Sequence, residues 1–181
     1  MRAEYVPLPP PQNIESIPLY LQNELQRIAR MLGGISERHA VGMYLAAASD
    51  TISSVSSTPV VIDSFDTLSG SATGIAANTN GTITFNAGLD YTITLSGDCT
   101  VSGGGGSATM TIGLYNEDTL VPGSGVSFTH LSGNHANAIS ITASASAVAG
   151  DVLDFRVSAD STVDVTFSNM SIHVSGQLSD V

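Results

Sequence analysis

The last two-thirds of the chain alternates apolar and polar residues, the period of two that is typical of half-buried β-strands. Glycine-containing and Ser/Thr-rich stretches separate the alternating segments. The apolar positions of successive segments are Val60 to Ile62, Ile83 and Phe85, Tyr91 to Leu95, Met110 to Leu114, Val126 and Phe128, Ile139 to Ala147, Val152 to Val157, and Val163 to Val174. Eight or more short strands of this kind predict a mainly β fold, an antiparallel jelly-roll sandwich over residues 59–181.

The last segment changes its apolar positions from odd to even numbers across Ser168-Asn169. One extra residue in a strand turns every later side chain to the other face of the sheet. The sequence therefore predicts a bulge or bend at this point.

A different period marks the one predicted α-helix, Ser16 to Leu32. Its apolar residues recur at steps of 4, 4, 3 and 4 and form a single stripe: Ile17, Leu21, Leu25, Ile28 and Leu32. Ser16 is a suitable N-cap, and Gly33-Gly34 supplies the stop. No second helix of similar length follows, so we expect the stripe to be buried against another copy, the head domain or a different protein.

The segments before and after this helix lack the long alternating pattern of the last two-thirds of the chain. Pro7, Pro9, Pro10 and Pro11 predict an extended arm without a core of its own. The predicted organisation is an arm and helix over 1–34, a linker or transition over 35–58, and a head domain over 59–181. Within the transition, Val41 to Ala48 fits a short strand or a helix equally well, and Asp50 to Thr58 is expected to be a linker.

Charge divides the chain in the same way. Only 12% of the 181 residues are charged, and lysine is absent. Residues 59–181 contain eleven acids and one base, Arg156, so we expect no binding to nucleic acid or to anionic membrane surfaces. No signal peptide and no apolar run long enough for membrane insertion is found. Cys99 is the only cysteine and is expected to be buried.

Few residues suggest chemistry, and we expect no enzyme activity, cofactor or metal. The Gly103–Gly106 run lacks the basic residue of a phosphate loop, and His130 and His135 are interpreted as surface loop histidines. Carboxylate pairs are interpreted as solvated turn residues, with calcium binding left open as an alternative. These pairs are Asp63 and Asp66, Asp151 and Asp154, and Asp160 and Asp164.

Over about residues 59–176 the chain resembles the jelly-roll family of tumour necrosis factor and the globular heads of complement proteins. The resemblance lies in an apolar strand and turn before Gly-x-x-Tyr at residues 84–91, in Ile-Gly-Leu-Tyr-Asn at 112–116, in Ala-Gly-Asp-Val-Leu at 149–153, and in the closing strand at 167–172. It implies three heads packed around a threefold axis, a homotrimer, and no catalysis.

The N-terminus resembles the first residues of tailed-phage structural proteins. Its Pro-rich segment is followed by Tyr-Leu-x-x-Glu-Leu-x-Arg-Ile-Ala at residues 20–29. The resemblance implies a virion-surface protein, assembled in the host cytoplasm and anchored to phage capsid or tail proteins as a capsid decoration or head fibre. The residues expected to bind the virion are Pro9, Pro10, Pro11, Ile17, Tyr20, Leu21, Leu25, Ile28 and Leu32.

Two alternatives remain open from the sequence. A tail-associated fibre would recognise a host cell-surface receptor through outer loops, with Gly104, Gly105, Asn134 and His135 as candidate contacts. A secreted bacterial module with a cytokine-like fold is the second alternative, and the absence of a signal peptide counts against it. In a homotrimer, the N-terminal helices of the three copies could form a bundle or each bind the virion separately. Separate docking is preferred because so short a coiled coil is marginal.

Overall fold

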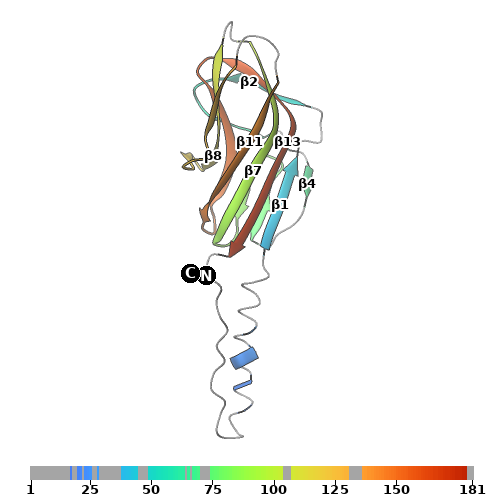
Figure 1. The fold of residues 1–181 in the computed structure, drawn as a ribbon, viewed down its shortest axis with the longest axis vertical. Helices are drawn as coiled ribbons and strands as arrows, with labels where there is room; N and C mark the ends of the chain where they lie inside the picture. Colours follow the sequence, from blue (N-terminus) through green and yellow to red (C-terminus); the bar gives the residue numbers. More distant parts are fainter. Residues whose placement is uncertain are drawn as a thin grey trace. The chain divides into compact units, whose positions relative to one another are not determined.

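The structure is a computed structural model of the 181-residue chain, and it divides into two units, residues 1–38 and 39–181. The residues that it describes are 17, 20–21, 23–25, 28, 38–44, 49–63, 65, 67–69, 74–103, 107–130 and 136–178. In the first unit the described residues of the predicted helix are all helical: Ile17, Tyr20, Leu21, Asn23, Glu24, Leu25 and Ile28. The second unit contains the strands (Figure 1).

One sheet of the second unit is built around three long strands. Its order is β11 (Ala136–Ala147), β7 (Leu89–Ser102), β13 (Val163–Leu178), β1 (Arg38–Tyr44) and β4 (Thr67–Ser69), and β2 (Asp50–Val55) also pairs with β13. The central strand β7 pairs antiparallel with β11 on one side and with β13 on the other, and Figure 1 shows the three side by side. The last long strand of the chain therefore lies between the first strands and β7.

The second sheet has shorter strands. Its order is β10 (Val126–His130), β8 (Ala108–Asn116), β12 (Val152–Ala159), β6 (Ile83–Phe85) and β5 (Ile75–Ala77), with β3 (Val60–Val61) on β12 and β9 (Thr119–Leu120) on β8. Because strands neighbouring in space come from distant parts of the chain, the connections cross from one sheet to the other. This is the jelly-roll arrangement that the alternating pattern predicts.

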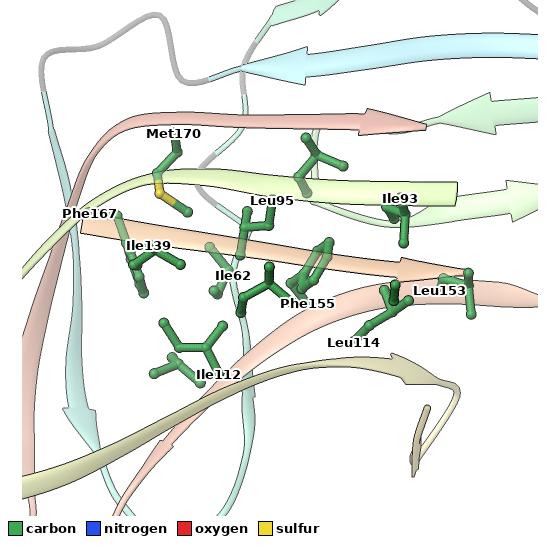
Figure 2. Packing of buried hydrophobic residues seen from close by; sticks show 14 of the residues in the cluster. Ile62, Ile93, Leu95, Ile112, Leu114, Ile139, Leu153, Phe155, Phe167 and Met170 are labelled. Atoms are coloured by element: carbon green, nitrogen blue, oxygen red, sulfur yellow. The ribbon is translucent and has the colours of Figure 1, made fainter. Parts of the chain in front are cut away.

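The apolar faces of the two sheets form one core (Figure 2). Ile93 and Leu95 of the first sheet and Leu114 and Phe155 of the second are at most 1% exposed. Each occupies an inward position of its strand, as the period-two pattern predicts. The predicted inward position of Val126 is wrong, because this residue of the edge strand β10 is exposed.

The predicted irregularity in the last strand is confirmed. The pairing of β13 with β7 shifts register between Ser168 and Ser171, and Asn169 there has a φ of 54°. Asparagine tolerates this left-handed conformation better than most residues, and its side-chain nitrogen donates to Asp98 at 3.0 Å. The bulge brings Phe167 before it and Met170 after it into the same core.

The expected linker over residues 35–58 is the main difference between prediction and structure. Residues 38–44 form β1, which settles the open choice for this region in favour of a strand over those residues. Residues 50–55 form β2 and pair with β13, so the interpretation of this part as a linker is wrong. The many Ser and Thr residues of this segment give it the composition of a loop. It becomes a strand because β13 supplies its backbone hydrogen-bond partners.

The single cysteine is buried, as expected. Cys99 lies on β7 with its side chain in the core. Burial, and to a lesser extent the charge of Asp98, raises the pKa of its thiol from 9.0 to about 11. A thiol in this state is protonated at neutral pH and reacts poorly.

Two glycines of similar conformation allow a matched test of the turn that packs against Ile62. Gly81 and Gly123 have φ values of 79° and 77°, but a Cβ at Gly81 would overlap the backbone oxygen of Ile62, whereas a Cβ at Gly123 would meet nothing within 4 Å. Gly123→Ala should lower the free energy of unfolding by about 1 kcal/mol through backbone strain. Gly81→Ala should cost about 3 kcal/mol or more, because overpacking is added to the same strain. Urea denaturation of both variants would measure this, and equal losses would contradict the close packing at Gly81.

Candidate functional site

The predicted virion-binding stripe is exposed on its helix. Ile17, Leu21, Leu25 and Ile28 are 40%, 52%, 65% and 37% exposed, while Glu24 of the same helix is buried. Tyr20, also predicted to bind the virion, is half-buried. Pro9, Pro10, Pro11 and Leu32 lie outside the described residues. Within the described residues, no helix combines the length and apolar character needed to span a membrane.

The outer-loop residues proposed for receptor contact cannot be placed. Gly104, Gly105, Asn134 and His135 lie outside the described residues. The first two lie between the end of β7 at Ser102 and the start of β8 at Ala108. The other two lie between the end of β10 at His130 and the start of β11 at Ala136.

His130, interpreted from the sequence as a surface loop residue, is the last residue of β10 and is buried. Its Nδ1 atom lies 3.5 Å from the side-chain nitrogen of Asn137 on β11. The interpretation is therefore wrong for this residue.

The outward face of β11, β7 and β13 is a regular array of small polar side chains, which we call the hydroxyl face. Strand register places its residues in three rows: Ser144–Thr92–Ser175, Thr142–Thr94–His173 and Ser140–Ser96–Ser171. Each row contains one hydroxyl–hydroxyl hydrogen bond, joining Thr92 to Ser144 at 2.9 Å, Thr94 to Thr142 at 3.1 Å, and Ser96 to Ser171 at 2.8 Å. These cross-strand bonds order the side chains across the face.

Carboxylates border the hydroxyl face but do not enter its rows. Asp90 lies beyond one end on β7, where Ser146 donates to it at 2.6 Å, and Asp98 and Asp164 lie beyond the other end. Eight hydroxyl side chains and His173 make up the rows themselves. The rows themselves therefore hold no carboxylate, although the domain is acidic.

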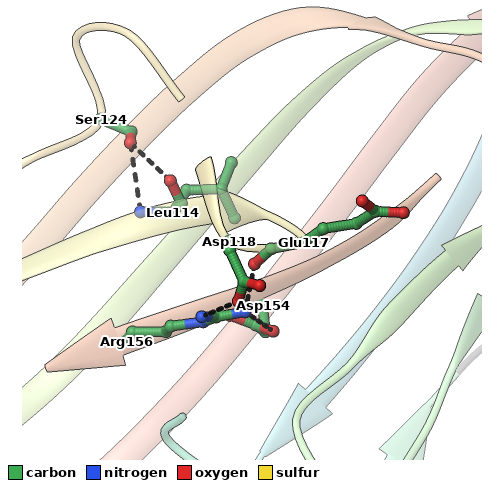
Figure 3. Close-up of polar contacts among 6 residues, drawn as sticks. All are labelled: Leu114, Glu117, Asp118, Ser124, Asp154 and Arg156. Atoms are coloured by element: carbon green, nitrogen blue, oxygen red, sulfur yellow. Dashed lines mark hydrogen bonds and ion pairs between the residues drawn. The ribbon is translucent and has the colours of Figure 1, made fainter. Parts of the chain in front are cut away.

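Arg156 on β12 organises the opposite sheet (Figure 3). Its Nε and Nη2 atoms donate to the two oxygens of Asp154 at 2.6 and 3.2 Å, and Nη1 donates to Asp118 at 2.9 Å. Nη2 also donates to the backbone oxygen of Glu117, and the guanidinium lies 5.0 Å from the ring centre of Tyr115. Hydrogen bonding to Asp154, followed by that to Asp118, raises the pKa of Arg156 above its ordinary value.

These contacts hold the turn between β8 and β9, where Glu117 has a φ of 53°. Ser124 holds the segment that follows the hairpin, because its hydroxyl lies 3.1 Å from both the nitrogen and the oxygen of Leu114 and donates to Val121 at 2.7 Å. Figure 3 shows both groups of contacts around the end of β8. The hairpin is thus fixed on both sides by side-chain bonds to the backbone.

The carboxylates considered for calcium have other structural roles. Asp154 is buried and paired with Arg156, so its interpretation as a solvated turn residue is wrong. Asp160 accepts from the nitrogen of Thr109 at 2.9 Å, which lowers its pKa, and Asp151 and Asp164 also accept from backbone nitrogens. Asp63 is exposed, and Asp66 lies outside the described residues. Among the described residues, no three His, Cys, Asp or Glu side chains are grouped to hold a metal.

Comparison with solved structures shows the fold. The structure of Eiger TNF from S. frugiperda is similar with a TM-score of 0.50 and 13% sequence identity, and the match covers 80% of this chain and 95% of that chain. The head has a tumour necrosis factor-like jelly-roll fold. The predicted jelly roll is therefore confirmed at the level of fold.

A second solved structure, the PRD1 vertex protein P5, matches 78% of this chain and 97% of its own with 18% identity. Its TM-score of 0.42 is too low to carry any property over to this protein. No model of a known protein family matches the sequence. No curated protein matches it either.

Sequence reasoning missed both the hydroxyl face and the Arg156 cluster. The polar positions of the alternating pattern were available, since Thr92, Thr94 and Ser96 follow one another at period two. That they join similar rows from β11 and β13 depends on register. The Arg156 cluster combines residues up to 41 positions apart, from Tyr115 to Arg156, a proximity that no local pattern contains.

The Arg156 cluster predicts unequal effects of removing its members. Arg156→Leu should lower the free energy of unfolding by about 3–5 kcal/mol, because it leaves the buried Asp154 carboxylate without its cation. Asp118→Asn should cost at most about 1 kcal/mol, because that carboxylate is exposed. The double variant Asp154→Asn/Arg156→Leu should recover part of the loss. Urea denaturation tests this, and similar costs for the two single variants would contradict it.

Proposed function

We propose that the protein is a non-enzymatic structural subunit of a bacteriophage virion, a homotrimeric capsid decoration or head fibre anchored through its N-terminal arm and helix. The observation that carries the proposal is the exposed stripe on the helix. Four apolar residues at helical spacing face solvent, while the acidic Glu24 is buried. An isolated helix this short is marginal in water, so a surface that covers the stripe would also stabilise the helix.

The phage assignment comes from the N-terminal sequence. A Pro-rich segment precedes the Tyr-Leu-x-x-Glu-Leu-x-Arg-Ile-Ala helix, and three members of the stripe lie within or beside this motif: Leu21, Leu25 and Ile28. A virion protein that accepts this stripe would bury about three or four large apolar side chains per subunit. Three tethered copies would raise one another's effective concentration at the particle, so each anchor can bind weakly.

The hydroxyl face supports the trimeric part of the proposal. Its rows hold no carboxylate, lysine or arginine, although the domain holds eleven acids and one base. Its hydroxyls both donate and accept, so facing copies can satisfy them without a complementary charge. Packing the face against a neighbouring head would also cover the outward side chains of β11, the last strand in this sheet's order among the described residues.

The anchoring role predicts loss of particle binding without loss of the head. Leu21→Ser/Leu25→Ser in the intact chain should weaken binding to particles roughly a hundredfold or more, since each buried leucine contributes about 1.5–3 kcal/mol. Asn23→Ser, at an exposed position of the same helix, should bind normally. Co-sedimentation with purified particles measures both. Wild-type binding by the double variant would contradict the anchoring role, and the number of bound copies would separate a shell decoration from a tail part.

The trimer predicts that a charge on the hydroxyl face is not tolerated. Thr92→Glu should shift the protein from trimer to monomer, because each buried carboxylate without a partner costs roughly 3–5 kcal/mol. Thr129→Glu, at an exposed threonine of the other sheet, should leave the trimer intact. Native mass spectrometry reports the populations. Trimers that persist with Thr92→Glu would show that this face is not the contact between subunits.

A further inference from the structure

His173 is the one titratable side chain in the rows of the hydroxyl face. It lies on β13 opposite Thr94 of β7, and the eight other residues of the rows are serines and threonines. The His173 side chain is exposed in the single subunit and has no hydrogen-bond partner among the described residues, whereas Thr94 is bonded to Thr142. A copy that covers this face would therefore also cover His173.

The carboxylates of the two longest strands lie away from His173. On β7 the acids are Asp90 and Asp98, each four positions from the residue opposite the histidine, which corresponds to roughly 13 Å along a strand. On β13 the acid is Asp164, nine positions from the histidine. At physiological ionic strength the screening length is about 8 Å, so these carboxylates do little to stabilise a charge on the ring.

The other strands of this sheet bring no carboxylate to the position either. β1, the neighbour of β13 in the sheet order, has Arg38, His39 and Tyr44 as its titratable residues and contains no acid. A positive charge on β1 would oppose a charge on His173 rather than stabilise it. Asp50 of β2 is opposite a residue six positions before the histidine, and β4 and β11 contain no acid.

The two protonation states of His173 differ in how well they fit a covered face. The neutral ring has one donor and one acceptor, so it can exchange hydrogen bonds with polar groups of a facing copy as the hydroxyls do. The protonated ring has two donors and a positive charge. Covering it removes its hydration, and its own sheet supplies no carboxylate to compensate. The covered face therefore favours the neutral ring.

We propose that His173 is a pH switch that opens the trimer under mildly acidic conditions. The inference rests on the trimer of the proposed function and adds a regulation of the same face. Because the ring between copies holds a proton less well than the ring of a separate subunit, separation of the copies takes up protons. The trimer is therefore most stable at neutral and higher pH.

This stability is lost as the pH falls below the value at which a histidine in water is half protonated, about 6.5. Each trimer contains three copies of the switch. The equilibrium constant for dissociation into three subunits should therefore rise by up to about a thousandfold per pH unit.

Sedimentation velocity of the intact protein at about pH 7.5 and about pH 5.5 tests the switch, since ordinary carboxylates stay ionised over this range. The natural protein should be trimeric at the higher pH and dissociate at the lower. His173→Gln, neutral at both, should be trimeric at both, and His173→Arg, charged at both, should be dissociated at both. The other histidines are the same in all three proteins, and circular dichroism checks that each variant is folded.

Three results would overturn the switch while leaving the trimer in place. The natural trimer could persist unchanged at about pH 5.5. Equal dissociation of the natural protein and His173→Gln would assign the acid response to another group. A trimer that tightens on acidification would show that the facing copy supplies a carboxylate to His173. Separate subunits at about pH 7.5 are a different outcome, which would overturn the proposed trimer and the switch with it.

Discussion

The antiparallel pairing of β7 with both β11 and β13 is the contact on which the rest of the head depends. It joins β11 and the C-terminal strand β13 to one central strand, so the sheet is complete only when the C-terminal strand is in place. Side chains alternate between the two faces along each strand, and the register of the ladder aligns them from strand to strand. The same pairing therefore gives the sheet an apolar inner face and a hydroxyl outer face. The inner face stabilises each subunit, and the outer face is the surface that we propose joins subunits.

Much of this ladder could be predicted from the sequence because the pattern is local. Tyr91, Ile93 and Leu95 alternate with threonines, and a strand is the only regular structure that places such residues on two separate faces. The bulge at Asn169 was predictable for the same reason, since one added residue reverses the facing of those that follow. The anchoring role of the helix stripe remains a prediction, although its exposed residues agree with it.

The errors arise where the partner, rather than the segment, decides the structure. Residues 50–55 have the composition of a linker and become a strand through pairing with β13. Asp154 and His130 are polar residues that sequence reasoning placed in solvent, yet both are buried. Asp154 is stabilised by Arg156, the only lysine or arginine of residues 59–181, and Arg156 also holds the β8–β9 hairpin through Glu117 and Asp118. Such non-local contacts leave no periodic signal in the sequence.

The central claim is that the hydroxyl face is covered by another copy, and the reactivity of a thiol placed there tests it most directly. Cys99 is buried with a raised pKa, so an introduced cysteine would be the only reactive thiol. We predict that Thr92→Cys in the intact native protein reacts with a maleimide much more slowly than Thr129→Cys, and that the two react alike after denaturation. Equal rates in the native protein would mean that the face is open to solvent, which would contradict the account.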